Sequence, residues 1–404
     1  MSITIADLHA AAAAIDGAVL RTPAVAAPAL SELCGAELVL KLENLQASGS
    51  FKARGALVRL LALGDDERRG GVIAMSAGNH AQGVAWHARR LGIPATIVMP
   101  AGTPFTKVER TSALGARVVL HGEGLAEAGA HAETLAAERG LVFVHPYDDP
   151  HIIAGQGTVG LELLTDHPDL ECLVVPVGGG GLIAGIAIAA RALKPGIDII
   201  GVQAAACCPL ARHPPPATSP QTLAEGIAVK HPGTLTRPLV DSLVDDVVAV
   251  PELLIERAIE ILVDREKIVA EGAGAAALAA VLAEPARFAG RKVGLVVSGG
   301  NIDGRLMASI LMRGLVRAGR LARLRIEISD APGTLAKVAS LIGTNGGNIV
   351  EIFHQRLFQD VPVKSAEVDA VIETTDTSHV RAMIEALTAA GYPTRLLGSL
   401  ATGE

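Results

Sequence analysis

One lysine of this chain follows a run of small residues at a point where a helix is expected to begin. Lys52 comes directly after Gly49-Ser50-Phe51, and Ala-Arg-Gly-Ala follows it. The positive end of a helix dipole disfavours the charged form of an amine that lies there. Because a neutral lysine amine attacks carbonyl carbon, Lys52 is a candidate for Schiff-base chemistry. On this pattern alone, an ordinary surface lysine is the competing interpretation.

A turn of small and polar residues lies where a second helix is expected to begin. It consists of Ser76, Ala77, Gly78, Asn79 and His80. An expected strand over 71–75 ends in this turn, and an expected helix over 81–91 follows it. Backbone N–H groups that converge before a helix bind anions, so the turn is a candidate site for a carboxylate. The competing interpretation is a plain turn capped by Ser76 or Asn79.

A third candidate site is a run of glycines after an apolar strand. Gly178, Gly179, Gly180, Gly181 and Leu182 stand between a strand over 172–177 and a long helix rich in Ala and Ile. Such a run lets several N–H groups turn to one phosphate at the helix start. It is neither a Walker A loop nor a strict GxGxxG fingerprint, and a flexible linker is the alternative. Ser298, after a strand over 292–297, could bond a ring nitrogen or simply form a turn.

These motifs lie within an alternation of strands and helices from about residue 35 to 300. Short β-branched runs predict strands at Glu37–Leu42, Gly71–Met75, Ala95–Met99, Arg117–Leu120, Cys172–Val177, Ile197–Gln203 and Lys292–Val297. Helical spacing of apolar residues marks 81–91, 124–139 and 182–193. The alternation predicts an α/β fold with parallel sheets covered on both faces. In such sheets ligands bind beyond the carboxyl ends of the strands, where the motifs lie.

The C-terminal part has a pattern of its own. The proline-rich stretch Leu210–Pro220 is expected to be a surface loop, and the basic stretch Met312–Ala322 a link between domains. From 323 to 404, period-2 and helical signals alternate in the order βαββαβ, which is the ferredoxin-like arrangement.

Composition argues against several classes of function. The 404 residues carry a formal net charge of −7, which leaves no basic surplus for binding nucleic acid. The N-terminus lacks a basic leader, and no stretch reaches the roughly 20 uninterrupted apolar residues of a membrane span. We therefore expect a cytoplasmic protein without membrane contact. The four cysteines show no metal-ligand spacing, so no metal site is expected.

In combination, the motifs resemble a known family. GSFKxRGA, SAGNHAQG, GGGGL and SGGN occur here in the order and rough spacing of the threonine dehydratases, or threonine ammonia-lyases. These are fold type II pyridoxal-phosphate enzymes. The resemblance covers residues 1–320 and implies a tryptophan synthase β-like pair of parallel-sheet domains, the smaller at about 48–145. It also implies conversion of L-threonine to 2-oxobutanoate and ammonia, and of L-serine to pyruvate.

The resemblance assigns roles to individual residues. Lys52 would bind pyridoxal 5'-phosphate and act as the base on the substrate's α-carbon. The residues expected to hold this cofactor are Phe51, Lys52, Asn79, Gly178, Gly179, Gly180, Gly181, Leu182 and Ser298. The turn from Ser76 to His80, including Ala77, Gly78 and Asn79, would bind the substrate carboxylate. Glu271 is expected near the cofactor ring.

Two departures from close relatives carry predictions. Serine racemases resemble this chain but have a serine in place of Ala77 as the base on the opposite face, so little racemase activity is expected. Metal-binding relatives have a glutamate where Gln203 stands here. Because an amide is a poorer ligand for a hard cation, metal dependence is not expected.

The C-terminal unit resembles an ACT domain, a module that commonly binds amino acids between paired copies. Asp330-Ala-Pro-Gly-Thr-Leu335 and Asn345-Gly-Gly-Asn348 match its first loop and helix exit. The resemblance implies control by isoleucine or valine and a homodimer or homotetramer. An oligomerisation domain without a ligand is the alternative.

Other functions remain open at this point. The same machinery would serve a serine or threo-3-hydroxyaspartate dehydratase. A non-catalytic amino-acid sensor belongs to another class, although the intact Lys52 speaks against it. A nicotinamide-dependent dehydrogenase would need a GxGxxG motif at the first strand, which is missing.

Overall fold

The computed structural model describes residues 3–214, 221–355 and 365–398. It divides into two compact units, Met1–Ile302 and Asp303–Glu404. This division falls before the boundary expected from the sequence, because helix α14 (Gly304–Arg317) groups with the second unit. Each unit is described by itself.

The first unit contains a large lobe built on a six-stranded sheet in the order β1-β2-β10-β7-β8-β9. Its strands are β1 (Ala24–Ala26), β2 (Glu37–Leu42), β7 (Cys172–Pro176), β8 (Asp198–Ala204), β9 (Asp246–Val250) and β10 (Lys292–Val297). All neighbouring pairs are parallel except β1 with β2. The central strands are buried on both faces, as their continuous Val, Leu and Ile runs predict.

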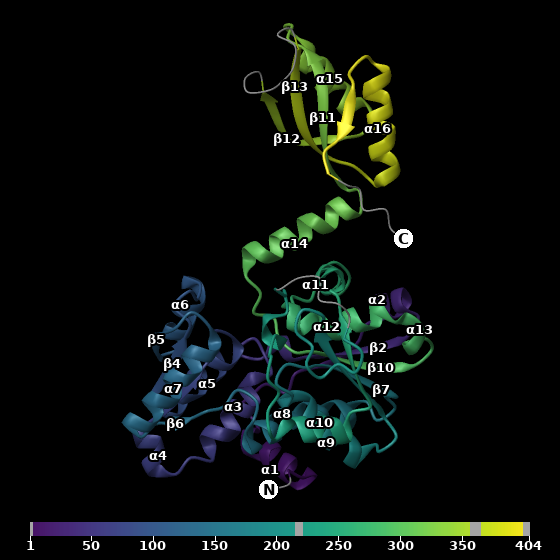
Figure 1. Ribbon diagram of the computed structural model, residues 1–404. Coiled ribbons are helices and arrows are strands. Elements are labelled where there is room, and N and C mark those ends of the chain that lie inside the picture. The colour runs from purple at the N-terminus through teal and green to yellow at the C-terminus, as the bar shows by residue number, and fades with distance from the viewer. Residues whose placement is uncertain (1–2, 215–220, 356–364, 399–404) are drawn as a thin grey trace. The chain divides into compact units, whose positions relative to one another are not determined.

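The small lobe of the same unit has a four-stranded parallel sheet in the order β5-β4-β3-β6. Its strands are β3 (Val72–Met75), β4 (Ala95–Met99), β5 (Arg117–Leu120) and β6 (Val142–Phe143). The helices α5 (Asn79–Leu91), α6 (Phe105–Ala113) and α7 (Leu125–Arg139) surround this sheet in Figure 1. The small lobe thus lies beside the large one with its own apolar core.

Several helices cover and join the two lobes. They are α1 (Ile5–Ile15), α2 (Pro28–Cys34), η1 (Glu43–Leu45), α3 (Lys52–Leu61), α4 (Asp65–Gly70), α8 (Pro150–Asp166), α9 (Gly181–Leu193), η2 (Glu225–Ile227), α10 (Thr236–Leu243), α11 (Glu252–Glu266), α12 (Gly272–Ala283) and α13 (Pro285–Phe288). The helices α3 and α8 pack together where the lobes meet: a methyl group on Gly155 would lie 2.6 Å from the Gly55 Cα. Only glycines permit this approach.

The second unit contains α14 and a four-stranded sheet in the order β12-β13-β11-β14. Its other elements are β11 (Leu321–Ser329), α15 (Thr334–Thr344), β12 (Asn348–Gln355), β13 (Ser365–Glu373), α16 (Thr377–Ala389) and β14 (Thr394–Leu396). All strand pairs are antiparallel. The predicted βαββαβ arrangement is therefore confirmed, with Leu324, Ile326 and Ile328 in the core as the alternation predicts.

The predicted α/β fold with parallel sheets is confirmed, and every strand predicted for the first unit is present. The edge strands β1, β6 and β9 were not predicted. β1 and β6 have only three and two residues, too few for a pattern, whereas β9 has five. The predicted link at Met312–Ala322 is wrong: it holds the end of α14 and the start of β11. Of the predicted loop Leu210–Pro220, residues 215–220 lie outside the described residues.

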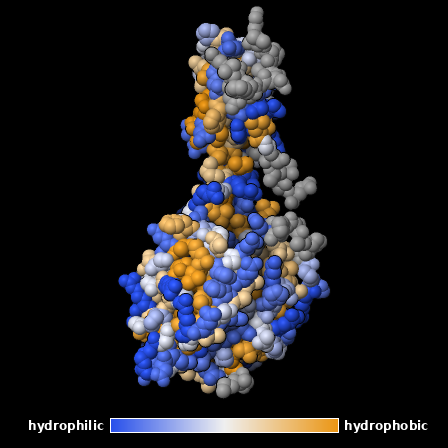
Figure 2. Space-filling view, turned by 60° about the vertical axis from the view of Figure 1, so that its left-hand side comes forward, coloured by the Kyte–Doolittle hydropathy of each residue, from blue (hydrophilic) through white to orange (hydrophobic). Residues whose placement is uncertain are grey.

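No helix in the described parts of the chain is long and apolar enough to cross a membrane. On the face of the first unit that Figure 2 draws, hydrophilic side chains intermix with small groups of apolar ones. This is the ordinary pattern of a solvated surface.

Candidate functional site

The sequence motifs converge at the carboxyl edges of the two sheets in the first unit. The turn after β3, the glycine run after β7 and the residues after β10 all follow parallel strands. Lys52 is the first residue of α3, and Phe51 stands at its N-cap position. The helix start expected from Gly-Ser-Phe is therefore correct, and it brings the lysine into this region.

The amine of Lys52 is held inside the first unit. Its Nζ donates to the Pro146 carbonyl oxygen at 2.6 Å and lies 5.2 Å from the centre of the Phe51 ring. Burial lowers the pKa of Lys52 to about 8, against a smaller opposing effect of Glu271. The sequence pattern predicted a lowered pKa from the helix dipole, whereas burial is the larger cause. A sizeable share of the amine is thus neutral near pH 8.

The segment before Lys52 is fastened to the segment after β10. Phe51 N donates to the Ser298 carbonyl oxygen at 3.1 Å, and Gly300 N donates to the Gly49 carbonyl oxygen at 2.9 Å. Ser50 pairs with Gly299 in an isolated antiparallel bridge. Ser298 is itself 3% exposed. These contacts fix Phe51 and Ser298 next to each other although the sequence separates them widely.

Asn79 is the centre of a side-chain network. Its Nδ2 donates to Glu271 Oε1 at 2.5 Å, and its Oδ1 accepts from Asn301 Nδ2 at 2.8 Å. Burial raises the pKa of Glu271 to about 7, and the Asn79 bond opposes the shift. A methyl group added at Gly299 would lie 2.5 Å from Glu271 Oε1, so glycine is needed for this carboxyl to reach Asn79.

The turn Ser76–His80 joins β3 to α5. Gly78 N donates to Ser76 Oγ at 3.1 Å, and Gly78 occupies the N-cap position without a side-chain cap. The His80 ring is buried, and its Nε2 donates to the Val144 carbonyl oxygen at 2.9 Å. Burial lowers the pKa of His80 to about 3, so the ring is neutral. The N–H groups at the start of α5 lack intrahelical partners, as in any helix, and offer donors to an anion.

The glycine run after β7 makes a tight entry into α9. Gly180 has a φ of +95°, a conformation that favours glycine. A methyl group at Gly179 would lie 2.3 Å from the Tyr147 ring, and one at Gly181 would lie 2.9 Å from the Tyr147 carbonyl oxygen. The Thr236 hydroxyl donates to the Gly179 carbonyl oxygen at 2.5 Å. The run is therefore held from two sides, with its N–H groups at the helix start.

The segment from His145 to Asp148, which follows β6, also belongs to this region, although the sequence motifs did not include it. The Pro146 carbonyl oxygen of this segment accepts the hydrogen bond from Lys52 Nζ. The Tyr147 ring of the same segment packs on Gly179. The Asp148 carboxylate accepts from the N–H groups of Thr234, Leu235 and Thr236 and caps α10. The signal available was the run His-Pro-Tyr-Asp-Asp after the four apolar residues Leu141–Val144.

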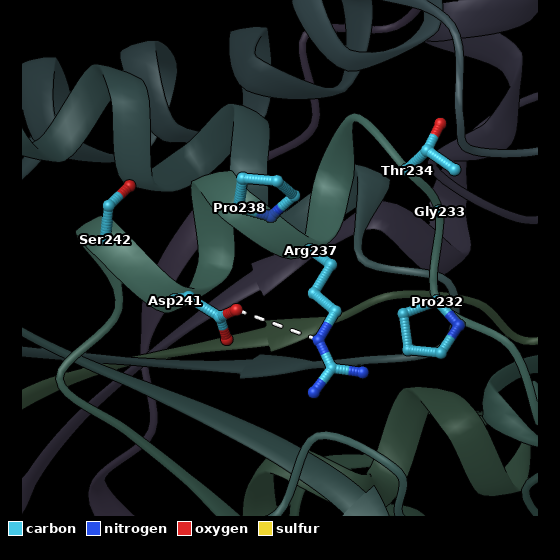
Figure 3. A pocket seen from close by; sticks show the side chains of 7 residues that line it. All are labelled: Pro232, Gly233, Thr234, Arg237, Pro238, Asp241 and Ser242. Carbon is cyan, nitrogen blue, oxygen red and sulfur yellow. Dashed lines mark ion pairs between the residues drawn. The ribbon is translucent and has the colours of Figure 1, made fainter.

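The loop that Asp148 holds forms the wall of an open pocket. Figure 3 shows its lining residues: Pro232, Gly233, Thr234, Arg237, Pro238, Asp241 and Ser242. Within it Arg237 Nε and Asp241 Oδ2 lie 3.7 Å apart. None of the site residues predicted from the sequence lines this pocket.

Gln203 lies in β8, where both ends of its amide are used. Its Nε2 donates to the Val177 carbonyl oxygen at 3.2 Å, and its Oε1 accepts from Leu210 N at 2.9 Å. Among the residues that the structure describes, no group of three or more His, Cys, Asp or Glu side chains could hold a metal ion.

This chain is similar in sequence to a family of cofactor-dependent enzymes and to several individual proteins. The model of the family described as "Pyridoxal-phosphate dependent enzyme" matches residues 15–299. An L-threonine ammonia-lyase from Thermotoga maritima is 45% identical over 401 residues, 98% of this chain and 100% of that protein. The L-threonine dehydratase catabolic TdcB of Escherichia coli K12 is 44% identical over 310 residues, 75% of this chain and 94% of that protein.

Two solved structures are similar to about three quarters of this chain. A threonine deaminase from tomato, Solanum lycopersicum, in its processed form (isoform 2), superimposes with a TM-score of 0.71 at 35% identity, over 76% of this chain and 87% of that one. The serine racemase from Dictyostelium discoideum gives a TM-score of 0.69 at 32% identity, over 74% of this chain and 99% of that one.

Proposed function

This chain belongs to the pyridoxal-phosphate-dependent enzyme family, and from that premise we propose that it converts L-threonine to 2-oxobutanoate and ammonia. L-Serine, which would give pyruvate, is the second substrate. The observation that carries the proposal is the Lys52 amine, with its lowered pKa, at the edge where the three predicted motifs end. The similarity to an L-threonine ammonia-lyase over essentially the whole chain supports threonine as the substrate.

The residues of this chain fit pyridoxal 5'-phosphate. Among the described residues, Ser50 Oγ and His80 Nδ1 are buried polar atoms without a hydrogen-bond partner, as expected where a polar ligand belongs. The glycine run offers the N–H groups at the start of α9 for a phosphate. In our assignment Gly178–Leu182 hold the phosphate.

Four side chains are assigned to the ring of the cofactor and its aldehyde. Phe51 would lie beside the ring, Asn79 would bond its 3′-oxygen, Ser298 would meet its nitrogen and Lys52 would hold the cofactor covalently. When bound, the cofactor supplies an electron sink that makes the α-proton of an amino acid acidic. A hydroxyl at position 298, rather than a carboxylate, would leave the ring nitrogen largely unprotonated and so favour elimination over longer-lived carbanion chemistry.

The protein's own residues provide binding and proton transfer. The turn Ser76–His80 binds the substrate carboxylate through backbone N–H groups, which orients the α-carbon. The neutral amine of Lys52 accepts the α-proton. The β-hydroxyl leaves as water, and a water molecule later displaces ammonia, so L-threonine gives 2-oxobutanoate and ammonia without net water. Ala77 carries no transferable proton for the opposite face, which disfavours racemisation.

The test is a spectrum and an assay on the same protein. Purified chain should show a visible absorption band of bound cofactor, and adding L-threonine should release 2-oxobutanoate and ammonia in equal amounts. A cofactor band together with product from L-serine or threo-3-hydroxyaspartate alone would keep the cofactor but replace L-threonine as the substrate. A protein that takes up no cofactor would overturn the proposal in favour of a sensor.

We expect kcat for L-threonine to fall as the pH drops through about 8, because a protonated Lys52 cannot accept the α-proton. An unperturbed lysine would lose its base form already below about pH 10. The negative charge of Glu271 favours the protonated amine, so Glu271→Gln should move this acidic limb to lower pH. A pH–rate profile of both proteins checks this, and a limb that moves to higher pH in the variant contradicts it.

Gly179→Ala should weaken cofactor binding by about 5- to 150-fold, since overpacking costs about 1–3 kcal/mol. The added methyl group would lie 2.3 Å from the Tyr147 ring. The dissociation constant is measured by titrating cofactor into cofactor-free protein. Gly196→Ala is the matched control, because a methyl group there meets nothing within 4 Å. Adding Tyr147→Ala to Gly179→Ala should restore part of the affinity, and an unchanged affinity in Gly179→Ala would refute the assignment.

We further propose that the second unit is an ACT-like regulatory domain that binds isoleucine or valine and helps to pair subunits into a homodimer or homotetramer. The left-handed Gly333 before α15 and Gly346 after it support the loop and helix exit that suggested this module. Titrating both amino acids against rate and melting temperature tests the effector. No response would leave an oligomerisation domain.

A further inference from the structure

An ion pair joins the two lobes of the first unit beside the candidate site. Lys107 Nζ of α6 lies 2.6 Å from Glu225 Oε2 of η2. The side chain of Lys107 is 31% exposed and that of Glu225 is 73% exposed. Lys107 stands in the first turn of α6, and α6 is labelled on the small lobe in Figure 1.

Lys107 lies on the same edge as the carboxylate-binding turn. The strands β3 and β4 are parallel neighbours, so the turn after β3 and the helix after β4 start at one edge of the sheet. The turn Ser76–His80 follows β3, and α6 follows β4. A cation on α6 is therefore close to the space that a substrate bound to this turn occupies.

Glu225 approaches the same space from the large lobe. A methyl group on its neighbour Gly226 would lie 3.7 Å from Glu271 Oε1, and the Gly226 carbonyl oxygen lies 3.1 Å from the Cβ position of Gly178. The charges of Lys107 and Glu225 both act on Glu271: Lys107 lowers the pKa of its carboxyl group and Glu225 raises it. The ion pair is thus within electrostatic reach of the network around Asn79.

We propose that Glu225, by pairing with Lys107, makes the site specific for β-hydroxy amino acids with uncharged side chains. This inference rests on the proposed function and goes further, because it names the residue that excludes a dicarboxylic substrate. Lys107 is the cation with which a second substrate carboxylate would pair, but it is already paired with Glu225. To reach Lys107, an anionic substrate side chain must therefore displace the Glu225 carboxylate, and it is repelled by the negative charges of Glu225 and Glu271. A hydroxyethyl or hydroxymethyl side chain leaves the pair intact.

The test compares Glu225→Gln, Lys107→Met and the double variant as full-length holoenzymes. We expect Glu225→Gln to raise the kcat/KM ratio of L-threo-3-hydroxyaspartate to L-threonine by about tenfold or more. The double variant should lose this gain, because no free cation remains. L-Aspartate and L-2-aminobutyrate, which lack the leaving hydroxyl, serve as inhibitors of opposite side-chain charge. Glu225→Gln should tighten inhibition by L-aspartate and leave inhibition by L-2-aminobutyrate nearly unchanged.

The control is Glu37→Gln, which breaks the exposed pair of Glu37 with Lys292 at the opposite, amino-terminal ends of β2 and β10. It should leave both ratios as in the unchanged protein. The proposal is overturned if Glu225→Gln leaves the substrate and inhibitor ratios unchanged, or if the double variant keeps the gain. It is also overturned if the unchanged protein prefers L-threo-3-hydroxyaspartate. Failure of the proposed function is a separate result, because no β-hydroxy amino acid would then react with any variant.

Discussion

Replacing Lys52 by alanine should lower kcat/KM for L-threonine by at least about 10⁴-fold, the upper range for losing one proton-transfer group. The side chain serves twice in the proposed reaction, as the amine that binds the cofactor and as the base. Its amine bonds only to the Pro146 carbonyl in the hydrogen bonds described for it, so the helix start of α3 does not depend on it. The variant should therefore fold.

The measurement is the rate of 2-oxobutanoate release together with the visible band. Lys52→Ala should lose the band of covalently bound cofactor while its circular dichroism stays unchanged. Lys194→Ala is a suitable control, because Lys194 donates to the Pro168 carbonyl oxygen on the surface. A small external amine should restore part of the proton transfer. Activity of Lys52→Ala within tenfold of the unchanged protein would disprove the central role of this residue.

Replacing Arg54 by methionine should lower the free energy of unfolding by about 3–5 kcal/mol, the usual cost of breaking a buried ion pair from one side. Arg54 is fully buried, and its guanidinium bonds Glu43 through Nε and Nη2 at 2.8 Å each and Glu162 through Nη1 at 2.6 Å. Without it, two carboxylates face the single cation Lys41.

Burial alone would raise the pKa of Glu43, but Arg54 outweighs it and the pKa is lowered. The ionised Glu43 therefore stabilises the fold above its ordinary pKa, and this stability is lost as the pH falls through the lowered value. In Arg54→Met the Glu43 carboxyl can take up a proton more easily. The difference in unfolding free energy between this variant and the unchanged protein should therefore shrink toward acidic pH. Urea unfolding of the full chain at two pH values measures both effects.

Arg69→Met provides the comparison for Arg54→Met, because Arg69 pairs with Asp66 on the surface of α4 with 72% of its side chain exposed. Its loss should cost less than about 1 kcal/mol. Equal costs for the two variants would show that the buried network around Arg54 carries no special share of stability.

Much of the site could be predicted because its signals are local. A glycine run after an apolar strand, or small residues before a helix, can be recognised within ten residues, and these placed Lys52, Ser76–His80 and Gly178–Leu182 on the correct elements. The fold class followed from the alternation of strand and helix. Ser298 drew no attention by itself and entered only through the family resemblance.

The remainder depends on contacts between distant segments. Tyr147 packs on Gly179 and Thr236 bonds the same residue, yet no short pattern links these positions. The Lys107–Glu225 pair joins residues from different lobes, which only the folded chain brings together. The end of α14 was predicted as a link, because the basic residues and glycines of Met312–Ala322 obscured the helical pattern that ends at Arg317.

The pairing of β2 with β10 has a consequence for synthesis of the chain. β2 is complete by Leu42, but its parallel partner β10 ends at Val297. The hydrogen bond from Phe51 N likewise forms only after Ser298 has been synthesised. β2 can pair with β1 early, but a ribosome must release nearly all of the first unit before β2 finds its parallel neighbour β10. Such long-range closure makes folding slow. Until it occurs, an unfinished or truncated chain contains Lys52 but lacks the contact that fixes Phe51 next to Ser298, so the candidate site is incomplete.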